Sequence, residues 1–442
     1  MTHIQDLQFK KEILPLFDFT GNNLAGDALE RLLSEIPPSV EEVTSRQEIL
    51  KTLLKKEELY APFSYSRSEF NEVYRYVEEI GNRGIYLRDP SLHLHFLFAA
   101  TERNREKGRL CQLFIFLYKI GQAWFSRLKP DEFTGEFRDK LQNINRIFVE
   151  LDVEKHQSIA RKRSFTISEV IRLVRALGEK CREGEMTVFW NDLSLFEAWL
   201  SISKGIRKYN FNFPVFSNNG LTITGLYHPL VKNPVKNDLS TQESVTLITG
   251  PNMSGKSTLL KSIGLCVVLA HLGLAVPASA CELPFFDVLS IAINLNDDLQ
   301  SGYSHFMTEI KTLKNVAVEA SHGKKCFAIF DELFRGTNVE DALAISKTTI
   351  LGLSGFAGSR FFISTHLHQL KETLDLKSDS GVKDKKEHHS IGTRYIECKL
   401  EQGVPVFTYK LREGWSDLKI GQIIFEQEGL NGLLLLYGLV TK

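Results

Sequence analysis

The sequence contains few cysteines, carries no net charge and has no long uninterrupted apolar run. Its six cysteines are scattered through 442 residues without a C-x-x-C pair. This spacing argues against a disulfide framework or a cysteine-rich zinc site, and it favours reduced thiols in a cytosolic protein. Lys and Arg together number 54, as do Asp and Glu. The overall charge therefore points to no nucleic-acid partner, and only a local basic patch could provide one.

Two further absences concern membranes. Residues 1–6 lack the apolar core of a signal peptide. The most apolar long run, 259–276, is interrupted by Lys261 and His271, which favours a buried helix over a membrane span. We therefore expect a cytoplasmic protein without a membrane partner. Its length is sufficient for two or three hydrophobic cores.

The hydrophobic pattern changes near residue 215. Before this point, apolar residues recur at helical spacing and predict a helical domain over 1–215. After it, short apolar runs alternate with helical patterns and predict an α/β domain over 216–442. The runs 325–330 and 360–364 are apolar on both faces, which is typical of central strands in a parallel sheet. Residues 393–399 and 404–410 predict antiparallel edge strands.

Three short basic clusters lie in the helical half, at 103–105, 107–109 and 161–163. Each could contact the phosphate backbone of a nucleic acid. The alternative is a solvated helix end, which is the more common role of such runs.

The strongest motif is TGPNMSGKST at 249–258, which matches the P-loop pattern G-x-x-x-x-G-K-S/T. An apolar strand-like run precedes it and a helix-like run follows it, so a surface turn before an ordinary helix is the weaker alternative. Glycines allow the tight turn that points backbone N–H groups at phosphate oxygens. The residues expected to bind the nucleotide are Gly250, Pro251, Asn252, Met253, Ser254, Gly255, Lys256, Ser257 and Thr258.

Two adjacent carboxylates follow the strand-like run 325–330. In a P-loop fold, Asp331 would hold Mg²⁺ together with the Ser257 hydroxyl, and Glu332 would orient and deprotonate the attacking water. His366 follows the next buried run and could donate to the γ-phosphate or position the water. The alternatives are an acidic turn after a strand and a structural histidine. ATP, ADP and Mg²⁺ are therefore the expected ligands.

A segment between the P-loop and the carboxylates contains Ser301, Gly302 and Ser304 before an apolar helical run. It resembles the signature segment of ABC-type ATPases, which acts on the nucleotide of a facing subunit. A capped helix start is the simpler alternative.

These motifs together resemble those of the MutS mismatch-repair ATPases, in which the G-P-N-M sequence of the loop is distinctive. The similarity extends over about 221–430 and includes 306–309, the Asp331-Glu332 pair and 364–366. The resemblance implies a helical core/lever domain followed by an ABC-type P-loop NTPase domain, which forms a homodimer through its ATPase domains. It also implies a D-loop-like segment at Arg335, Gly336, Thr337 and Asn338.

The sequence departs from the family pattern in several places. It begins near the family's core, so we expect a truncated MutS-like protein without the mismatch-recognition and connector domains. Leu333 and Phe334 replace a pair of small residues, and Leu230 and Val231 stand where an aromatic often stacks on adenine. We expect weak, backbone-mediated DNA binding in mismatch repair or recombination. The alternative is an ATP-driven protein-interaction switch without DNA binding; an ABC transporter subunit is disfavoured by the helical first half.

Overall fold

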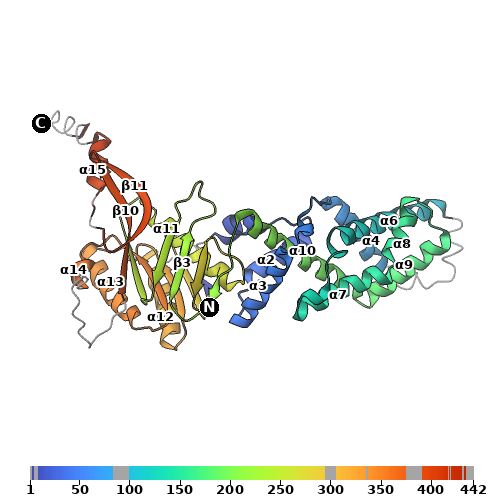
Figure 1. The fold of residues 1–442 in the computed structure, drawn as a ribbon, viewed down its shortest axis with the longest axis horizontal. Coiled ribbons are helices and arrows are strands. Elements are labelled where there is room, and N and C mark those ends of the chain that lie inside the picture. The colour runs from blue at the N-terminus through green and yellow to red at the C-terminus, as the bar shows by residue number, and fades with distance from the viewer. Residues whose placement is uncertain are drawn as a thin grey trace. The chain divides into compact units, whose positions relative to one another are not determined.

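The computed structural model describes residues 2–3, 8–82, 99–293, 305–334, 337–374, 391–416, 418, 420–430 and 433–434 (Figure 1). By its internal contacts the chain separates into two compact units. The helical unit comprises 16–36 and 45–208, and the sheet unit comprises 1–15, 37–44 and 209–442. The domain division near residue 215 stays a prediction.

The helical unit consists of helices packed around an aromatic core. Helix α9 shows how its ends are fixed: Thr166 Oγ accepts the Glu169 N–H at 3.2 Å, and the Glu169 carboxylate accepts the Thr166 N–H at 2.8 Å. This reciprocal capping satisfies two N–H groups that the helix leaves unpaired. The helices of this unit are α2 (Asn23–Ser34), most of α3 (Val40–Leu54), α4 (Arg67–Asn82), α6 (Ala100–Ile120), α7 (Gly135–Glu150), α8 (Val153–Arg161), α9 (Ile167–Arg182) and α10 (Glu185–Tyr209).

The sheet unit contains a seven-stranded sheet in the order β1-β7-β8-β9-β5-β10-β11. Its strands are β1 (Thr2–His3), β7 (Val288–Ala292), β8 (Cys326–Phe330), β9 (Arg360–Ser364), β5 (Val245–Thr249), β10 (Ile391–Glu401) and β11 (Val404–Glu413). Every neighbouring pair is parallel except β10 with β11. A smaller sheet has the order β2-β6-β3-β4, from β2 (Val215–Phe216), β6 (Ala280–Leu283), β3 (Leu221–Leu226) and β4 (Asn237–Thr241).

Helices cover both faces of the central strands. One face packs against α12 (His305–Ser321) and α13 (Val339–Ser354), whose Val316 and Ile350 join the strand core. Helix α11 (Lys256–His271) packs on the other face, where the backbone of Gly264 lies close to Ile291 and Ile329. The described residues also include the short helices α1 (Leu14–Phe17), α14 (Leu370–Thr373) and α15 (Gly421–Gln427). All residues of β5, β7, β8 and β9 are buried, because helices shield the sheet from water on both sides.

The fold is thus a mixture of a helical part and an α/β part, as the sequence predicts. The two central strands predicted at 325–330 and 360–364 are confirmed as β8 and β9. The antiparallel strands predicted at 393–399 and 404–410 are confirmed as parts of β10 and β11, and β11 is an edge strand. The prediction that 393–399 also lies at an edge is wrong, because β10 pairs in parallel with β5. No helix among the described residues has the length and apolar character needed to cross a membrane.

Candidate nucleotide site

The loop after β5 is shaped by backbone conformations that favour glycine. Gly250 has φ +137° and Gly255 has φ +97°, both outside the range of ordinary side chains. A Cβ at Gly250 would also lie 3.1 Å from Ser254 Oγ and 3.2 Å from the Ile396 carbonyl oxygen. Met253, with φ +67°, is three-quarters exposed on the outside of the turn. The loop therefore bends back on itself and leads directly into the N-terminus of α11.

Lys256 lies inside this loop. Its Nζ donates to the carbonyl oxygens of Gly250 at 3.0 Å and Pro251 at 3.1 Å, and its side chain is buried. Burial lowers the pKa of Lys256, whereas the nearby charges of Glu332 and Asp331 raise it. The ammonium is thus enclosed by the loop and close to both carboxylates that the sequence singles out.

The loop also contains a buried polar atom that the protein does not satisfy. Ser254 is fully buried, and its Oγ has no hydrogen-bond partner among the described residues. A buried hydroxyl without a partner costs free energy, so such groups usually await a ligand or water. A phosphate oxygen, which accepts hydrogen bonds, fits this arrangement of a free hydroxyl, a buried ammonium and a helix N-terminus.

Ser364 connects the two carboxylate residues. It ends β9 beside β5 and is fully buried. Its Oγ accepts the Glu332 N–H at 2.8 Å and donates to Asp331 Oδ1. The Asp331 N–H in turn donates to the Ala292 carbonyl oxygen at 3.0 Å. Because the strands are parallel, their carboxyl ends meet at one edge, and the hydroxyl of one strand end fixes the turn after another.

Glu332 and His366 form a direct hydrogen-bonded pair. The distance between His366 Nε2 and Glu332 Oε1 is 2.5 Å, and both side chains are partly exposed. The carboxylate is therefore oriented from two sides, through its backbone by Ser364 and through its side chain by His366. A carboxylate held in this way at a solvent-accessible edge can take a proton from a water molecule.

The turn from 331 to 334 has an unusual backbone. Glu332 has φ +55° and Phe334 has φ +65°, a backbone conformation that residues other than glycine rarely adopt. Buried contacts hold the turn in place, since Phe334 is fully buried and its N–H donates to Glu309 Oε2 at 3.0 Å. Residues in such conformations cost about 1–3 kcal/mol each and cluster at functional sites.

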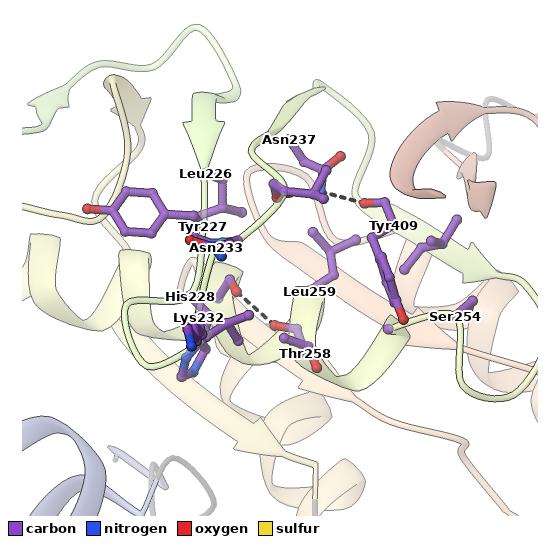
Figure 2. A pocket seen from close by; sticks show the side chains of 16 residues that line it. Leu226, Tyr227, His228, Lys232, Asn233, Asn237, Ser254, Thr258, Leu259 and Tyr409 are labelled. Carbon is purple, nitrogen blue, oxygen red and sulfur yellow. Dashed lines mark hydrogen bonds between the residues drawn. The ribbon is translucent and has the colours of Figure 1, made fainter. Parts of the chain in front are cut away.

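A pocket of about 390 Å³ opens beside the P-loop. Figure 2 shows Tyr409 beside Leu259 and Ser254, with Tyr227 and Asn237 on the other walls. The Tyr409 ring is close to the loop, because its Cδ1 would lie 3.2 Å from a Cβ placed on Gly255. Asn237 fixes this part of β11 by donating to the Tyr409 carbonyl oxygen at 3.0 Å and accepting the Leu411 N–H at 2.8 Å. The pocket thus combines an aromatic face with apolar walls next to the loop.

A second hollow of about 340 Å³ is lined by Asn252, Thr337, Glu332 and His366, among others. Asn252 of the loop and Thr337 of the expected D-loop-like segment therefore lie beside the Glu332–His366 pair. Asn338 has a separate structural role as the N-cap of α13, where its Oδ1 accepts the Asp341 N–H at 2.8 Å.

The structure describes some of the other predicted site residues and not the rest. Ser257 and Thr258 are exposed in the first turn of α11. The signature residues Ser301, Gly302 and Ser304 lie outside the described residues, as do Arg335 and Gly336 of the D-loop-like segment. Leu230 and Val231 are both exposed, and Val231 lines the pocket with Tyr409.

Sequence reasoning did not foresee the roles of three residues that the structure brings into the site: Ser364 as a link, Glu309 as a support for the 331–334 turn, and Tyr409 as a pocket wall. Ser364 is the last residue of a buried strand run, so a small polar residue at that position was a usable signal. Tyr409 had no comparable signal, because its position depends on the parallel pairing of β10 with β5.

The fold and this sheet edge define a mixed helical and α/β protein with a phosphate-loop sequence at the carboxyl end of a central parallel strand. Residues 246–430 match the family model of MutS domain V. The chain is 29% identical over 297 residues to the DNA mismatch repair protein MutS of Bacillus pumilus (strain SAFR-032), which covers 65% of this chain and 33% of that protein. It is 31% identical over 349 residues to the protein of the same name in Geobacillus sp. (strain WCH70), covering 68% and 39%.

The chain belongs to the MutS family. It spans about a third of the length of the curated relatives that it matches.

Proposed function

We propose that the sheet unit is an ABC-type P-loop NTPase domain that binds ATP with Mg²⁺ and hydrolyses it to ADP. One observation carries the proposal: Lys256, Asp331, Glu332 and His366, which are far apart in the sequence, meet at one sheet edge. They lie beside a loop with the buried and unpartnered hydroxyl of Ser254. This combination suits a polyphosphate that is cleaved by water.

The loop supplies the groups that bind phosphate. Its backbone N–H groups and the N-terminus of α11 carry partial positive charge, and Lys256 adds a full charge. The ammonium donates to two carbonyl oxygens of the loop, which it would exchange for phosphate oxygens. The pocket with Tyr409 lies next to the loop and suits the adenine ring, because an aromatic side chain stacks on any base.

Ser257 and Asp331 are the residues that would hold Mg²⁺. No group of three or more His, Cys, Asp or Glu within the described ranges could hold a metal alone. This suits Mg²⁺, which keeps several waters and binds one or two carboxylates plus substrate phosphates. When bound, Mg²⁺ neutralises charge on the phosphates. The hydrogen bond from Ser364 Oγ would fix Asp331 in position for this role.

Glu332 is proposed to accept the proton of the attacking water. The Ser364 hydroxyl holds its backbone and His366 holds its side chain, so the carboxylate is oriented before the substrate arrives. Lys256 stabilises the negative charge on the phosphate that is transferred.

The proposed active form is a homodimer through the ATPase domains, in which Ser301, Gly302 and Ser304 of one subunit complete the nucleotide site of the other. We further propose that the protein associates with DNA in mismatch repair or recombination, weakly and through the phosphate backbone. The names of the relatives favour this role over an ATP-driven protein-interaction switch. Phosphate contacts carry no direct sequence information, so little preference for a mismatch is expected.

The proposal is tested with two variants that separate binding from chemistry. Lys256→Ala removes the charge that faces the phosphates and should abolish measurable ATP binding in calorimetric titration. Glu332→Gln keeps the shape of the side chain but removes the base, so ATP binding should persist while turnover falls by roughly 10²-fold or more. Equal ATP affinity in wild type and Lys256→Ala would contradict the nucleotide site, and normal turnover in Glu332→Gln would contradict the role of the base.

A further inference from the structure

A basic hollow lies on the helical unit, well apart in sequence from the nucleotide site. It has a volume of about 880 Å³ and is formed by the N-terminal half of α6 together with the C-terminal end of α8 and the residues that follow. Its cationic lining residues are Arg105, Lys107, Arg109, Arg161 and Arg163. All three basic clusters of the helical half contribute to it, and helix packing brings 161–163 next to the other two.

The charge of this hollow is of one sign. Among the described residues that line it, five of eleven are Arg or Lys, and none is Asp or Glu. In the whole chain, Lys and Arg account for 54 of 442 residues and are balanced by 54 acids. Lys107 and Arg163, from different elements, act on the same thiol: burial raises the pKa of Cys111, whereas both cations lower it. The cations therefore converge on one concave surface.

Most of these cations are available to a ligand. In the part of the chain that the structure describes, Arg105, Lys107 and Arg163 form no ion pair, and Arg105 and Arg163 are exposed. Two of the cations have partners: Glu79 binds Arg109 at 2.5 Å, and its guanidinium lies 4.7 Å from the centre of the Tyr76 ring. The guanidinium of Arg161 lies 6.0 Å from the centre of the Tyr118 ring. Like charges at close range repel each other, so an unpaired group of this kind is stabilised by a polyanion.

Ordinary helix electrostatics explains only part of the arrangement. The C-terminus of a helix attracts cations, which accounts for Arg161 and Arg163 at the end of α8. It does not account for Arg105 and Lys107, because they lie in the N-terminal half of α6. A solvated helix end is therefore an incomplete explanation of the hollow.

Gly108 provides a second and independent observation. It lies inside α6, where glycine costs about 1 kcal/mol relative to alanine. Packing against the described residues does not require it, since a Cβ at this position would meet none of their atoms within 4 Å. In contrast, a Cβ at Gly205 of α10 would lie 2.6 Å from the Leu16 carbonyl oxygen. Gly108 lines the hollow, so the missing side chain leaves its floor open to a bulky ligand.

We propose that this basic hollow binds the phosphate backbone of double-stranded DNA, with Arg105, Lys107, Arg161 and Arg163 contacting phosphates across the open floor at Gly108. The inference rests on the DNA-association part of the proposed function and is independent of nucleotide binding. Four phosphate contacts give a logarithmic salt slope of about −3.6, so the affinity falls on the order of a hundredfold between 50 and 200 mM salt.

The test measures fluorescence anisotropy of a labelled perfect duplex of about 30 base pairs with the full chain, without nucleotide, at several salt concentrations. The test variant combines Arg105→Glu, Lys107→Glu and Arg163→Glu. The control combines Arg127→Glu, Arg138→Glu and Lys155→Glu, three exposed residues of the same unit outside the hollow, and changes the net charge equally. The test variant should lose at least tenfold in affinity at 50 mM salt and reduce the salt slope by two to three, whereas the control should stay within about threefold of wild type.

Substitutions at Gly108 separate the shape of the hollow from its charge. Gly108→Ala should raise the melting temperature and leave DNA affinity within about twofold of wild type, because a methyl group meets nothing there. Gly108→Trp should weaken DNA binding several-fold at unchanged charge, with its helical circular dichroism showing that the unit is folded.

The outcomes distinguish the two proposals. A wild-type chain that does not bind duplex DNA at 50 mM salt would overturn both this inference and DNA association, while leaving the ATPase untouched. Equal losses in the test and control triples would mean that only net charge matters and would overturn the assignment to the hollow alone. Tighter binding of a duplex RNA of the same length, lost in the same test variant, would overturn the assignment to DNA.

Discussion

The Ser364 hydroxyl allows a matched test of what holds Asp331 and Glu332 in place at the sheet edge. Ser364→Ala removes one hydrogen bond to the Asp331 carboxylate and one from the Glu332 N–H. A hydrogen bond to a charged group contributes about 1.5–3 kcal/mol, and a buried N–H left unpaired costs about 1–3 kcal/mol. Since the two effects overlap at one atom, we expect a destabilisation of about 3 kcal/mol. For a unit of this size that corresponds to a fall of roughly 6–12 °C in melting temperature.

Ser290 is the control. It lies in β7, is also fully buried, and its Oγ has no hydrogen-bond partner among the described residues. Ser290→Ala removes an unsatisfied polar group, so it should leave stability unchanged or raise it by up to about 1 kcal/mol. Scanning calorimetry of the intact chain resolves the difference. If Ser364→Ala melted at the same temperature as Ser290→Ala, the Ser364 hydrogen bonds would contribute nothing and the reasoning would be refuted.

The same substitution bears on chemistry. Without the hydroxyl, both carboxylates lose one of the contacts that orient them, and misplacement of a catalytic group by about 1 Å can cost on the order of 10²-fold. ATP turnover by Ser364→Ala should therefore fall by roughly 10- to 100-fold, measured below its melting temperature. Ser290→Ala should retain full turnover, because Ser290 lines neither hollow of the site and its Oγ forms no hydrogen bond with the described residues.

Two other predictions concern stability and base recognition. The His271 ring donates from Nδ1 to the Val267 carbonyl oxygen and accepts the Phe286 N–H at Nε2, and burial lowers its pKa to about 4. The ordinary pKa of histidine is about 6.5, so the contribution of His271 to the free energy of unfolding is fully present above pH 6.5. This free energy should fall by up to about 3 kcal/mol towards pH 4, because protonation then favours the unfolded chain. In denaturant titrations at several pH values, His271→Gln should remove this part of the pH dependence. Tyr409→Ala should weaken ATP binding by about 10-fold with nearly unchanged turnover at saturating ATP, because stacking on a base contributes about 1–3 kcal/mol. Tyr409→Phe keeps the ring and should bind ATP normally. Equal ATP affinity of the wild type and both variants would remove Tyr409 from the site.

Local patterns made much of the sheet unit predictable. The strands β8 and β9 are continuous apolar runs, and such runs belong to strands that helices cover on both faces. Once parallel strands are assumed, the residues after them must share an edge, which is why Asp331 and His366 could be grouped with the P-loop in advance. The mixed helical and α/β class follows from the same change of pattern near residue 215.

Features that depend on pairing between distant segments could not be predicted. The partner of the Ser364 hydroxyl is set by the alignment of β9 with β8 and β5, which the sequence of one strand does not encode. Tyr409 reaches the loop only because β10 lies parallel to β5 and carries β11 with it. The meeting of 161–163 with the basic residues of α6 likewise depends on helix packing. In each case the local sequence is compatible with several arrangements, and tertiary contacts select one.

The pairing of β1 with β7 has a consequence for producing the sheet unit on its own. Thr2 pairs with Leu289, although the two residues are far apart in the sequence. Residues 1–15 belong to the same unit as 209–442. A fragment that starts at 209 would therefore present the outer edge of β7 without its neighbour, and unpaired strand edges template association with other chains. An expression fragment that joins 1–15 to 209–442 through a flexible linker should stay monodisperse at concentrations where the shorter fragment aggregates. The β1–β7 pair is also a contact of high sequence separation, and such contacts slow folding because a long loop has to close before they form.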